Sequence, residues 1–123
     1  MLSLLSGSHL IARKRFYMTD KTIVLTNTGS QEEARKIARA LLERKLAACV
    51  NIVPSVESAY WWQAKVETAT EWMLLIKTVQ SKFERVRDTV AELHSYDLPE
   101  CIAITIADGS KEYLNWIAES VQP

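Results

Sequence analysis

The amino-acid sequence predicts an α+β domain made of two β-α-β units followed by a closing helix. Two observations carry this prediction. Apolar residues recur at helical spacing in two stretches, and β-rich apolar runs precede and follow each of these stretches. The chain of 123 residues is long enough to bury a hydrophobic core as one domain. We expect this domain to cover residues 21–120, and residues 1–20 to form a flexible N-terminal extension.

The first half of the domain has the pattern of a strand, a helix and a second strand. Residues 22–28, TIVLTNT, are a β-rich run that ends in turn-forming residues. Residues 30–45 place alanine, isoleucine and leucine on one helical face, and Ser30 with Glu33 matches a capping box. Residues 46–54 alternate as a strand does, and Pro54 limits the pairing that follows.

Residues 57–78 are strand-rich and unusually long. We expect a β-hairpin here that turns near Gln63 and Ala64 and has one arm much longer than the other. Its segment WMLLIKT is almost continuously apolar, which predicts a central strand covered on both faces.

The second half closes with a helix, a strand and a short helix. Residues 81–94 carry an apolar stripe, and Ser81 with Glu84 suggests another capping box. Residues 101–109 alternate as a strand, and residues 111–120 form a short amphipathic helix. The order β-α-β-β-α-β is typical of the ferredoxin-like sandwich, in which strands one and three are central and two helices cover one face of an antiparallel sheet.

Charge and hydropathy exclude several classes of protein. The formal net charge is zero, so the sequence predicts no nucleic-acid partner. No apolar run approaches the ~20 residues that span a bilayer, so we expect no membrane insertion. The basic residues Arg13, Lys14 and Arg15 follow the first apolar residues instead of preceding them, unlike in a secretory signal. Cys49 and Cys101 lie in separate apolar runs, which favours buried thiols in a reducing compartment. We therefore predict a cytoplasmic protein.

Four large aromatic rings lie within thirteen residues of the expected hairpin, at Tyr60, Trp61, Trp62 and Trp72. A hairpin longer than its sheet projects beyond it, where no core of the same chain is large enough to cover the rings. Exposed aromatic surface of this kind usually marks an interface. We therefore predict that Trp61, Trp62 and Trp72 contact other subunits. The alternative is that all four rings cap the core of their own chain.

Two groups of polar residues are candidates for a binding site. Lys65, Glu67 and Glu71 are separated by even numbers of residues, so an unbroken strand points them to one side. They line either a polar cleft between subunits or a solvated strand face. Residues 94–100, HSYDLPE, contain a histidine and two acids. Pro99 favours an extended backbone here, so the spacing does not predict that three donors meet at one ion. His94 is alternatively a histidine at a helix C-terminus.

Four ordered blocks of this sequence, ERKLAACVNIVP, YWWQAKVETATEWMLLIKT, HSYDLPE and YLNWI, resemble the divalent-cation tolerance protein family, CutA. The resemblance runs from about Thr22 to Ser120. The residues that match the family's pattern in the middle blocks are Tyr60, Trp62, Lys65, Glu67, Glu71, Lys77 and Thr78, followed by His94, Tyr96, Pro99 and Glu100.

The resemblance implies a ferredoxin-like fold assembled as a tight homotrimer, with interlocking hairpins and no enzymatic activity. The family is linked to tolerance of divalent metals and to copper binding. This resemblance implies a cleft for an unknown small ligand at Tyr60, Trp62, Lys65, Glu67, Glu71, Lys77 and Tyr96.

The sequence departs from the family's copper-binding pattern at two positions. Metal-binding relatives have a cysteine where this chain has Thr26, and a histidine where it has Leu93. Threonine and leucine are poor copper ligands. We therefore expect at most a weak divalent-cation site, for copper or zinc, that uses His94 with the carboxylate of Glu100.

Two other functions remain open at this point. A trimeric regulator similar to the PII-type nitrogen proteins would bind a ligand without metal. A small hydrolase would use Glu100 and His94 as acid and base, but the turn after the first strand lacks the arginine of acylphosphatases, and no GxSxG motif is present.

Overall fold

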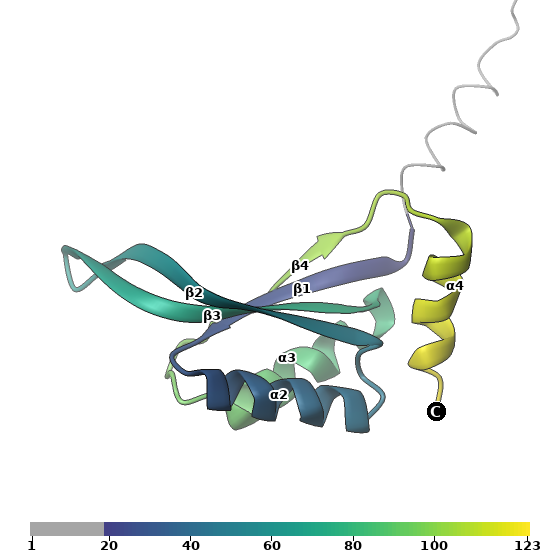
Figure 1. Ribbon diagram of the computed structural model, residues 1–123, viewed down its shortest axis with the longest axis horizontal. Helices are drawn as coiled ribbons and strands as arrows, with labels where there is room; N and C mark the ends of the chain where they lie inside the picture. Colours follow the sequence, from purple (N-terminus) through teal and green to yellow (C-terminus); the bar gives the residue numbers. More distant parts are fainter. Residues whose placement is uncertain (1–18) are drawn as a thin grey trace, which may run out of the picture.

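The computed structural model describes residues 19–123, which form a four-stranded sheet, two helices beneath it and a third across one end (Figure 1). The elements, in chain order, are β1 (Lys21–Thr28), α2 (Gln31–Glu43), β2 (Cys49–Trp62), β3 (Lys65–Val79), the 3-10 turn η1 (Gln80–Lys82), α3 (Phe83–Leu93), β4 (Ile102–Thr105) and α4 (Lys111–Ser120). No helix in this part of the chain is long and apolar enough to cross a membrane.

The strands are ordered β2-β3-β1-β4, and each neighbouring pair is antiparallel. This confirms the predicted α+β class and the central positions of β1 and β3. Ile23 of β1 pairs with Lys77 on one side and Ile104 on the other, which fixes which residues share a face. β4 is shorter than the predicted strand 101–109, although the Ile106 amide still donates to the Lys21 carbonyl at 2.9 Å.

The core lies between the sheet and the two helices α2 and α3 (Figure 1). It forms because β1 and β3 turn every second residue toward these helices, whose apolar stripes face the sheet. The largest fully buried side chains of this core are Val24, Ile37, Leu41, Leu74, Ile76, Val86 and Val90. A smaller cluster of Val79, Ile117 and Val121 attaches α4 to the end of β3.

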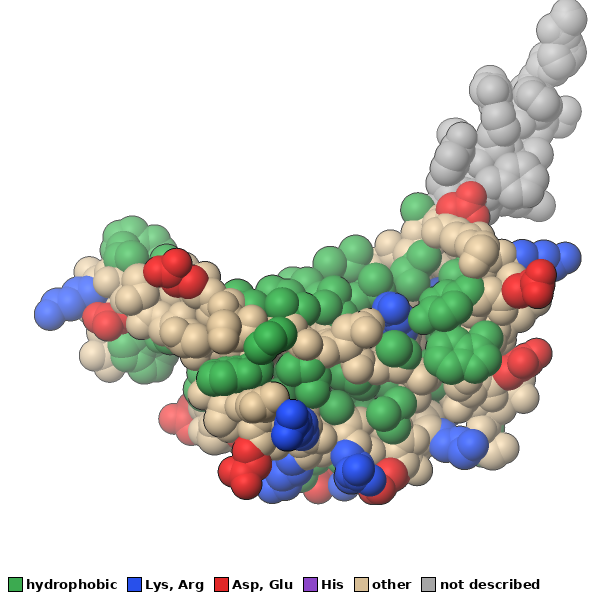
Figure 2. All heavy atoms as spheres, in the orientation of Figure 1, with side chains coloured by type: hydrophobic (Ala, Val, Ile, Leu, Met, Phe, Trp, Pro, Cys, Tyr) green, Lys and Arg blue, Asp and Glu red, His purple; other side chains and the backbone are tan. Residues whose placement is uncertain are grey.

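The other side of the sheet is apolar and has no helix of the same chain over its middle (Figure 1). We call it the open sheet face. By register its apolar residues are Ile23, Leu25, Val53, Met73, Leu75, Ile102 and Ile104, and the polar Asn51 and Lys77 lie on the same side. Figure 2 shows hydrophobic atoms gathered along this upper side of the body. The prediction that WMLLIKT is covered on both faces is therefore wrong for the single chain. Trp72, Leu74, Ile76 and Thr78 face the helices, whereas Met73, Leu75 and Lys77 lie on the open sheet face.

The β2–β3 hairpin extends well beyond the rest of the sheet (Figure 1). β1 stops pairing with β3 at Thr28 and Trp72, so residues 65–71 pair with β2 alone. The chain turns at Gln63 and Ala64 as predicted, both with left-handed φ angles of 51° and 66°. The two arms have 14 and 15 residues, so the predicted inequality of the arms is wrong. Pro54 is accommodated in a β-bulge between Val53 and Val56 instead of ending the strand.

The ends of the helices follow the capping predictions in part. Ser30 caps α2, since its hydroxyl oxygen accepts from the Glu33 amide at 3.1 Å. The second predicted capping box does not form, because η1 precedes α3 and makes Lys82 its N-cap residue without a side-chain bond. Cys49 and Cys101 are free and lie at opposite edges of the sheet, but both are half-buried instead of fully buried.

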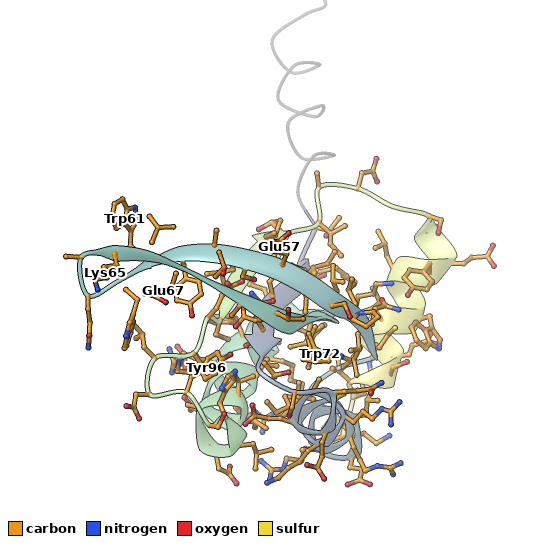
Figure 3. All side chains as sticks on the ribbon, turned by 60° about the vertical axis from the view of Figure 1, so that its left-hand side comes forward. Glu57, Trp61, Lys65, Glu67, Trp72 and Tyr96 are labelled. Atoms are coloured by element: carbon orange, nitrogen blue, oxygen red, sulfur yellow. The ribbon has the colours of Figure 1, made fainter. Side chains whose placement is uncertain are left out.

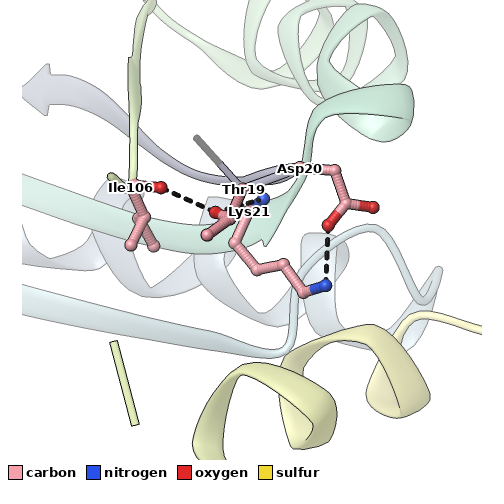
Figure 4. A network of polar contacts seen from close by, with 4 residues as sticks. All are labelled: Thr19, Asp20, Lys21 and Ile106. Carbon is pink, nitrogen blue, oxygen red and sulfur yellow. Dashed lines mark hydrogen bonds and ion pairs between the residues drawn. The ribbon is translucent and has the colours of Figure 1, made fainter. Parts of the chain in front are cut away.

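Thr19 ties the start of the described chain to the end of β4 (Figure 4). Its hydroxyl donates to the Ile106 carbonyl at 2.6 Å and accepts from the Lys21 amide at 3.0 Å. Asp20 pairs with the Lys21 ammonium at 2.6 Å. The domain's contacts therefore begin two residues before the predicted boundary at residue 21. The rest of the predicted extension, residues 1–18, lies outside the described residues.

Candidate functional site

A hollow of about 710 Å³ lies between the projecting hairpin and the loop of residues 94–101 that joins α3 to β4. Figure 3 shows Tyr96 on this loop beneath the part of the hairpin that carries Trp61, Lys65 and Glu67. The hollow is lined by Asn27, Ser58, Ala59, Tyr60, Trp61, Trp62, Glu71, Tyr96, Asp97, Leu98 and Glu100. Three separate segments of the sequence therefore meet here: the end of β1, the hairpin and the loop.

A hydrogen bond between Tyr96 and Glu71 joins the two sides of the hollow. The phenol hydroxyl donates to Oε2 of Glu71 at 2.9 Å, and Glu71 is only 7% exposed. Burial, the hydrogen bond to Glu71 and the negative charge of that carboxylate raise the pKa of Tyr96 to about 12. The hydroxyl lies against Gly29, where a Cβ would approach it to 3.1 Å. The absence of a side chain at Gly29 thus leaves room for the ring.

His94 holds the loop in place with both of its ring nitrogens. Nε2 lies 2.6 Å from the Asn27 carbonyl oxygen, and Nδ1 lies 3.1 Å from the Tyr96 amide. A carbonyl accepts and an amide donates, so these contacts require a neutral ring protonated at Nε2. The ring also packs against Tyr96, with centroids 4.7 Å apart. A metal ion at His94 would have to displace one of these two hydrogen bonds.

The charge of the lining is negative. Glu71, Asp97 and Glu100 contribute three carboxyl groups, and no lysine or arginine is among the lining residues. The Asn27 amide donates to Oε1 of Glu100 at 3.3 Å. Burial and the nearby charge of Glu71 raise the pKa of the Glu100 carboxyl above its usual value. Both effects disfavour a second uncompensated negative charge in this place.

The sequence-predicted cleft residues on the hairpin divide into two sets. Tyr60 pairs with Glu67 and Trp62 with Lys65, and β3 is unbroken from residue 65 to 79, so Lys65, Glu67 and Glu71 share one side as predicted. Tyr60, Trp62 and Glu71 line the hollow, whereas Lys65 and Glu67 lie toward the hairpin tip (Figure 3).

Lys77 does not join the hollow. It lies at the other end of β3, where its ammonium is 3.4 Å from the Tyr113 hydroxyl and 5.5 Å from the centre of that ring. Its place in the predicted cleft is therefore not seen within the single chain.

The aromatic rings also divide. Trp61 is 75% exposed and Trp62 is 55% exposed, which agrees with a surface available to other subunits. Trp72 instead packs against the core of its own chain, opposite the inward-facing Thr28. Trp72 is therefore partly covered by its own chain, and the interface role predicted for it stays a prediction. The alternation along β3 explains the difference, because Trp72 precedes Leu74 by two residues on the helix side.

The two positions that depart from the copper pattern are not part of the hollow. Thr26 is fully buried on the helix side of β1, and Leu93 packs against the same core. Within residues 19–123, no group of three histidine, cysteine or acidic side chains is arranged to hold a metal ion. The predicted weak site at His94 and Glu100 stays a prediction.

Sequence reasoning missed Asn27, Gly29 and Glu33 as residues that organise the site. Glu33 accepts from the Ser95 amide at 2.6 Å and from its hydroxyl at 3.1 Å, and so anchors the start of the loop to α2. Asn27 and Gly29 lie in the turn TNTGSQ and looked like ordinary turn formers, whereas Glu33 was assigned only to the capping box of the following helix. Their role depends on a loop that lies more than sixty residues away in the sequence.

Comparison with known proteins identifies the family. Residues 22–120 match the family model described as CutA1 divalent ion tolerance protein.

The chain belongs to the CutA1 divalent ion tolerance family.

The similarity extends to individual members of this family. The divalent-cation tolerance protein CutA of Archaeoglobus fulgidus is 53% identical over 93 residues, which cover 76% of this chain and 90% of the relative. The chloroplastic protein CutA of Arabidopsis thaliana is 43% identical over 100 residues, covering 81% of this chain and 55% of the relative. The solved structure of the periplasmic divalent cation tolerance protein CutA from Archaeoglobus fulgidus aligns with a TM-score of 0.81 at 48% identity, covering 83% and 99% of the two chains. The resemblance inferred from the sequence is thereby confirmed, while these names include compartments other than the predicted cytoplasm.

Proposed function

We propose that the chain acts in tolerance of divalent metal ions as a homotrimer whose subunits close the hollow and bind a cationic ligand there. The open sheet face is the observation that carries the assembly. Seven apolar side chains on this face lack a cover from the helices, and Ile102 and Ile104 are about half exposed. A contiguous apolar surface of this kind usually marks an interface.

The hairpin supports the same assembly. It projects past the sheet and carries exposed Trp61 and Trp62 near its tip. Aromatic side chains are enriched at interfaces, and the outer edge of β2 is unpaired in the described chain. Packing of the open face against other subunits would bring a neighbouring surface close to the hollow.

The lining of the hollow supports a positively charged ligand. Two carboxyl groups, of Glu71 and Glu100, are close enough for the charge of one to raise the pKa of the other. A cation between them would relieve this repulsion. The divalent form of the proposal is weak binding of copper or zinc by these carboxylates, with His94 as a further ligand once it gives up a hydrogen bond. Donors from a neighbouring subunit would complete such a site.

The assembly is tested by light scattering coupled to size-exclusion chromatography. Ile104→Glu places a charge on the open sheet face, and Leu42→Glu is the matched control, because Leu42 is 43% exposed on α2 and Ile104 is 50% exposed. We expect the wild type and the Leu42 variant to elute as trimers, and the Ile104 variant as smaller species. A monomeric wild type would overturn the proposed assembly.

The metal form is tested by calorimetric titration with copper and zinc. We expect weak binding that Glu100→Gln reduces. Binding that His94→Ala leaves unchanged would remove His94 as a ligand, and the absence of binding to wild type would remove the metal form while leaving the trimer standing.

A further inference from the structure

The size of the hollow points to a ligand larger than a metal ion. Its volume of about 710 Å³ lies in the range of sites for small organic molecules. A bare metal ion needs three or more donors that converge within coordination distance, and residues 19–123 show no such group. His94, the most suitable donor nearby, already uses both ring nitrogens to hold the loop.

The walls of the hollow combine negative charge with aromatic rings. Glu71, Asp97 and Glu100 supply carboxyl groups, while Tyr60, Trp62 and Tyr96 supply rings. Glu71 is more than nine-tenths buried, yet it has no salt bridge to any lysine or arginine in the described chain. Its Oε2 accepts from Tyr96, while its other oxygen has no donor within residues 19–123 and remains accessible from outside. Burial of a carboxylate without a neighbouring cation costs free energy. A positively charged ligand beside Glu71 would therefore be stabilised.

We propose that the hollow binds an organic ammonium ion with apolar substituents, through the carboxylates of Glu71 and Glu100 and the ring faces of Tyr60 and Trp62. This inference rests on the proposed function in one respect, namely that the hollow binds a cation. Aromatic rings attract alkylated ammonium ions because the face of the ring is negative. The rings also cover the apolar substituents, which a divalent metal ion does not have. A hydrated metal ion would gain little from these walls.

The structure holds the binding groups in position before a ligand arrives. Tyr96 fixes the carboxylate of Glu71, and the Asn27 amide fixes that of Glu100. The loop that carries Tyr96 is in turn held by His94 and by Glu33. Little conformational freedom is left to be lost on binding, which favours affinity.

The test is calorimetric titration of the full chain with n-butyltrimethylammonium, n-pentanol, copper and zinc in parallel. The alcohol has the same apolar chain but no charge. We expect the ammonium ion to bind with a Kd below about 1 mM and the alcohol to show no binding in the same range. Equal binding of both compounds would show an apolar pocket only and would overturn the proposal.

Variants locate the binding. Trp62→Leu keeps an apolar side chain but removes the ring, and we expect it to weaken ammonium binding roughly tenfold. Its matched control is Trp116→Leu, on the exposed surface of α4, which should leave the affinity unchanged. Glu100→Gln should weaken binding by a similar factor, whereas Glu43→Gln on α2 should not. Equal loss in a variant and its control would overturn the assignment to the hollow.

The outcomes separate this inference from the proposed function. Metal binding that Glu100→Gln reduces, without ammonium binding, would overturn the organic ligand and keep the cation site. A wild type that is trimeric but binds neither class would overturn both binding proposals and keep the assembly. Ammonium binding by a monomeric wild type would overturn the assembly alone.

Discussion

Replacing Tyr96 by phenylalanine removes one hydrogen bond and leaves the aromatic ring in place. The bond lost is the 2.9 Å contact from the phenol hydroxyl to Glu71, a carboxylate that is 7% exposed. Hydrogen bonds to charged groups contribute about 1.5–3 kcal/mol. Because the hollow is open enough for water to replace the hydroxyl in part, we expect a loss of about 2 kcal/mol in the free energy of unfolding.

Urea denaturation at neutral pH measures this loss, with all chains compared at one protomer concentration because assembly would make stability concentration-dependent. Tyr113→Phe is the matched control. The Tyr113 hydroxyl is exposed, and its one contact, with the Lys77 ammonium, is long at 3.4 Å. A double-mutant cycle with Glu71→Gln isolates the pairwise energy. A loss below about 0.5 kcal/mol, or one equal to that of the Tyr113 variant, would refute the reasoning.

The difference in unfolding free energy between wild type and Tyr96→Phe should depend on pH. The reason is that the pKa of Tyr96 is about 12 in the folded chain and 10.0 in the unfolded chain. Since the folded pKa is raised, the bond's contribution is fully present below pH 10 and is lost as the pH rises through about 12. The gap between wild type and Tyr96→Phe should therefore stay constant up to pH 10 and close above it.

Three further changes test other parts of the structure. Lys45→Gly should raise the free energy of unfolding by about 1 kcal/mol, because Lys45 has a φ of 58° where the last turn of α2 favours glycine; an unchanged urea midpoint would contradict this. Ala64→Gly at the hairpin turn, with a φ of 66°, should stabilise by a similar amount, measured in the same way. Glu100→Gln should leave stability unchanged near pH 4 and raise it at pH 7. The pKa of Glu100 is raised by burial and by Glu71, so the wild type loses stability as the pH rises above about 4.5. The gain should stay below about 1 kcal/mol, since Glu100 is exposed and its repulsion is screened. A thermal-melt series from pH 4 to 7 that shows no divergence from wild type would contradict the pH prediction.

Local periodicity was sufficient to predict the elements of this fold and their order. Val24, Leu74 and Ile76 face the helices because strand alternation leaves them no other side, and the apolar stripes of α2 and α3 meet them. Pro54 misled the prediction at the hairpin, because a proline in a strand suggests an end to pairing. In the structure, Pro54 lies in a β-bulge between Val53 and Val56. Ser55, the residue after the proline, has a φ of 58°.

The site was predicted less completely than the fold. Tyr60, Trp62, Glu71, Tyr96 and Glu100 do line one hollow. Asn27 could not be found from the sequence, because its role depends on bonds from its carbonyl to His94 and from its amide to Glu100. Lys77 was assigned by its match to a family pattern, and within one chain it lies beside Tyr113 at the other end of the strand.

The start of β1 and the C-terminal helix α4 both lie at the end of the molecule opposite the hairpin tip (Figure 1). The C-terminus and the hollow under the hairpin therefore lie toward opposite ends of the molecule. An immobilisation tag, a fluorophore or a second domain joined after α4 would leave from the side remote from Trp62 and Tyr96. Such attachments should leave the hollow accessible to its ligand, so binding can be measured on tethered protein without blocking the surface under study.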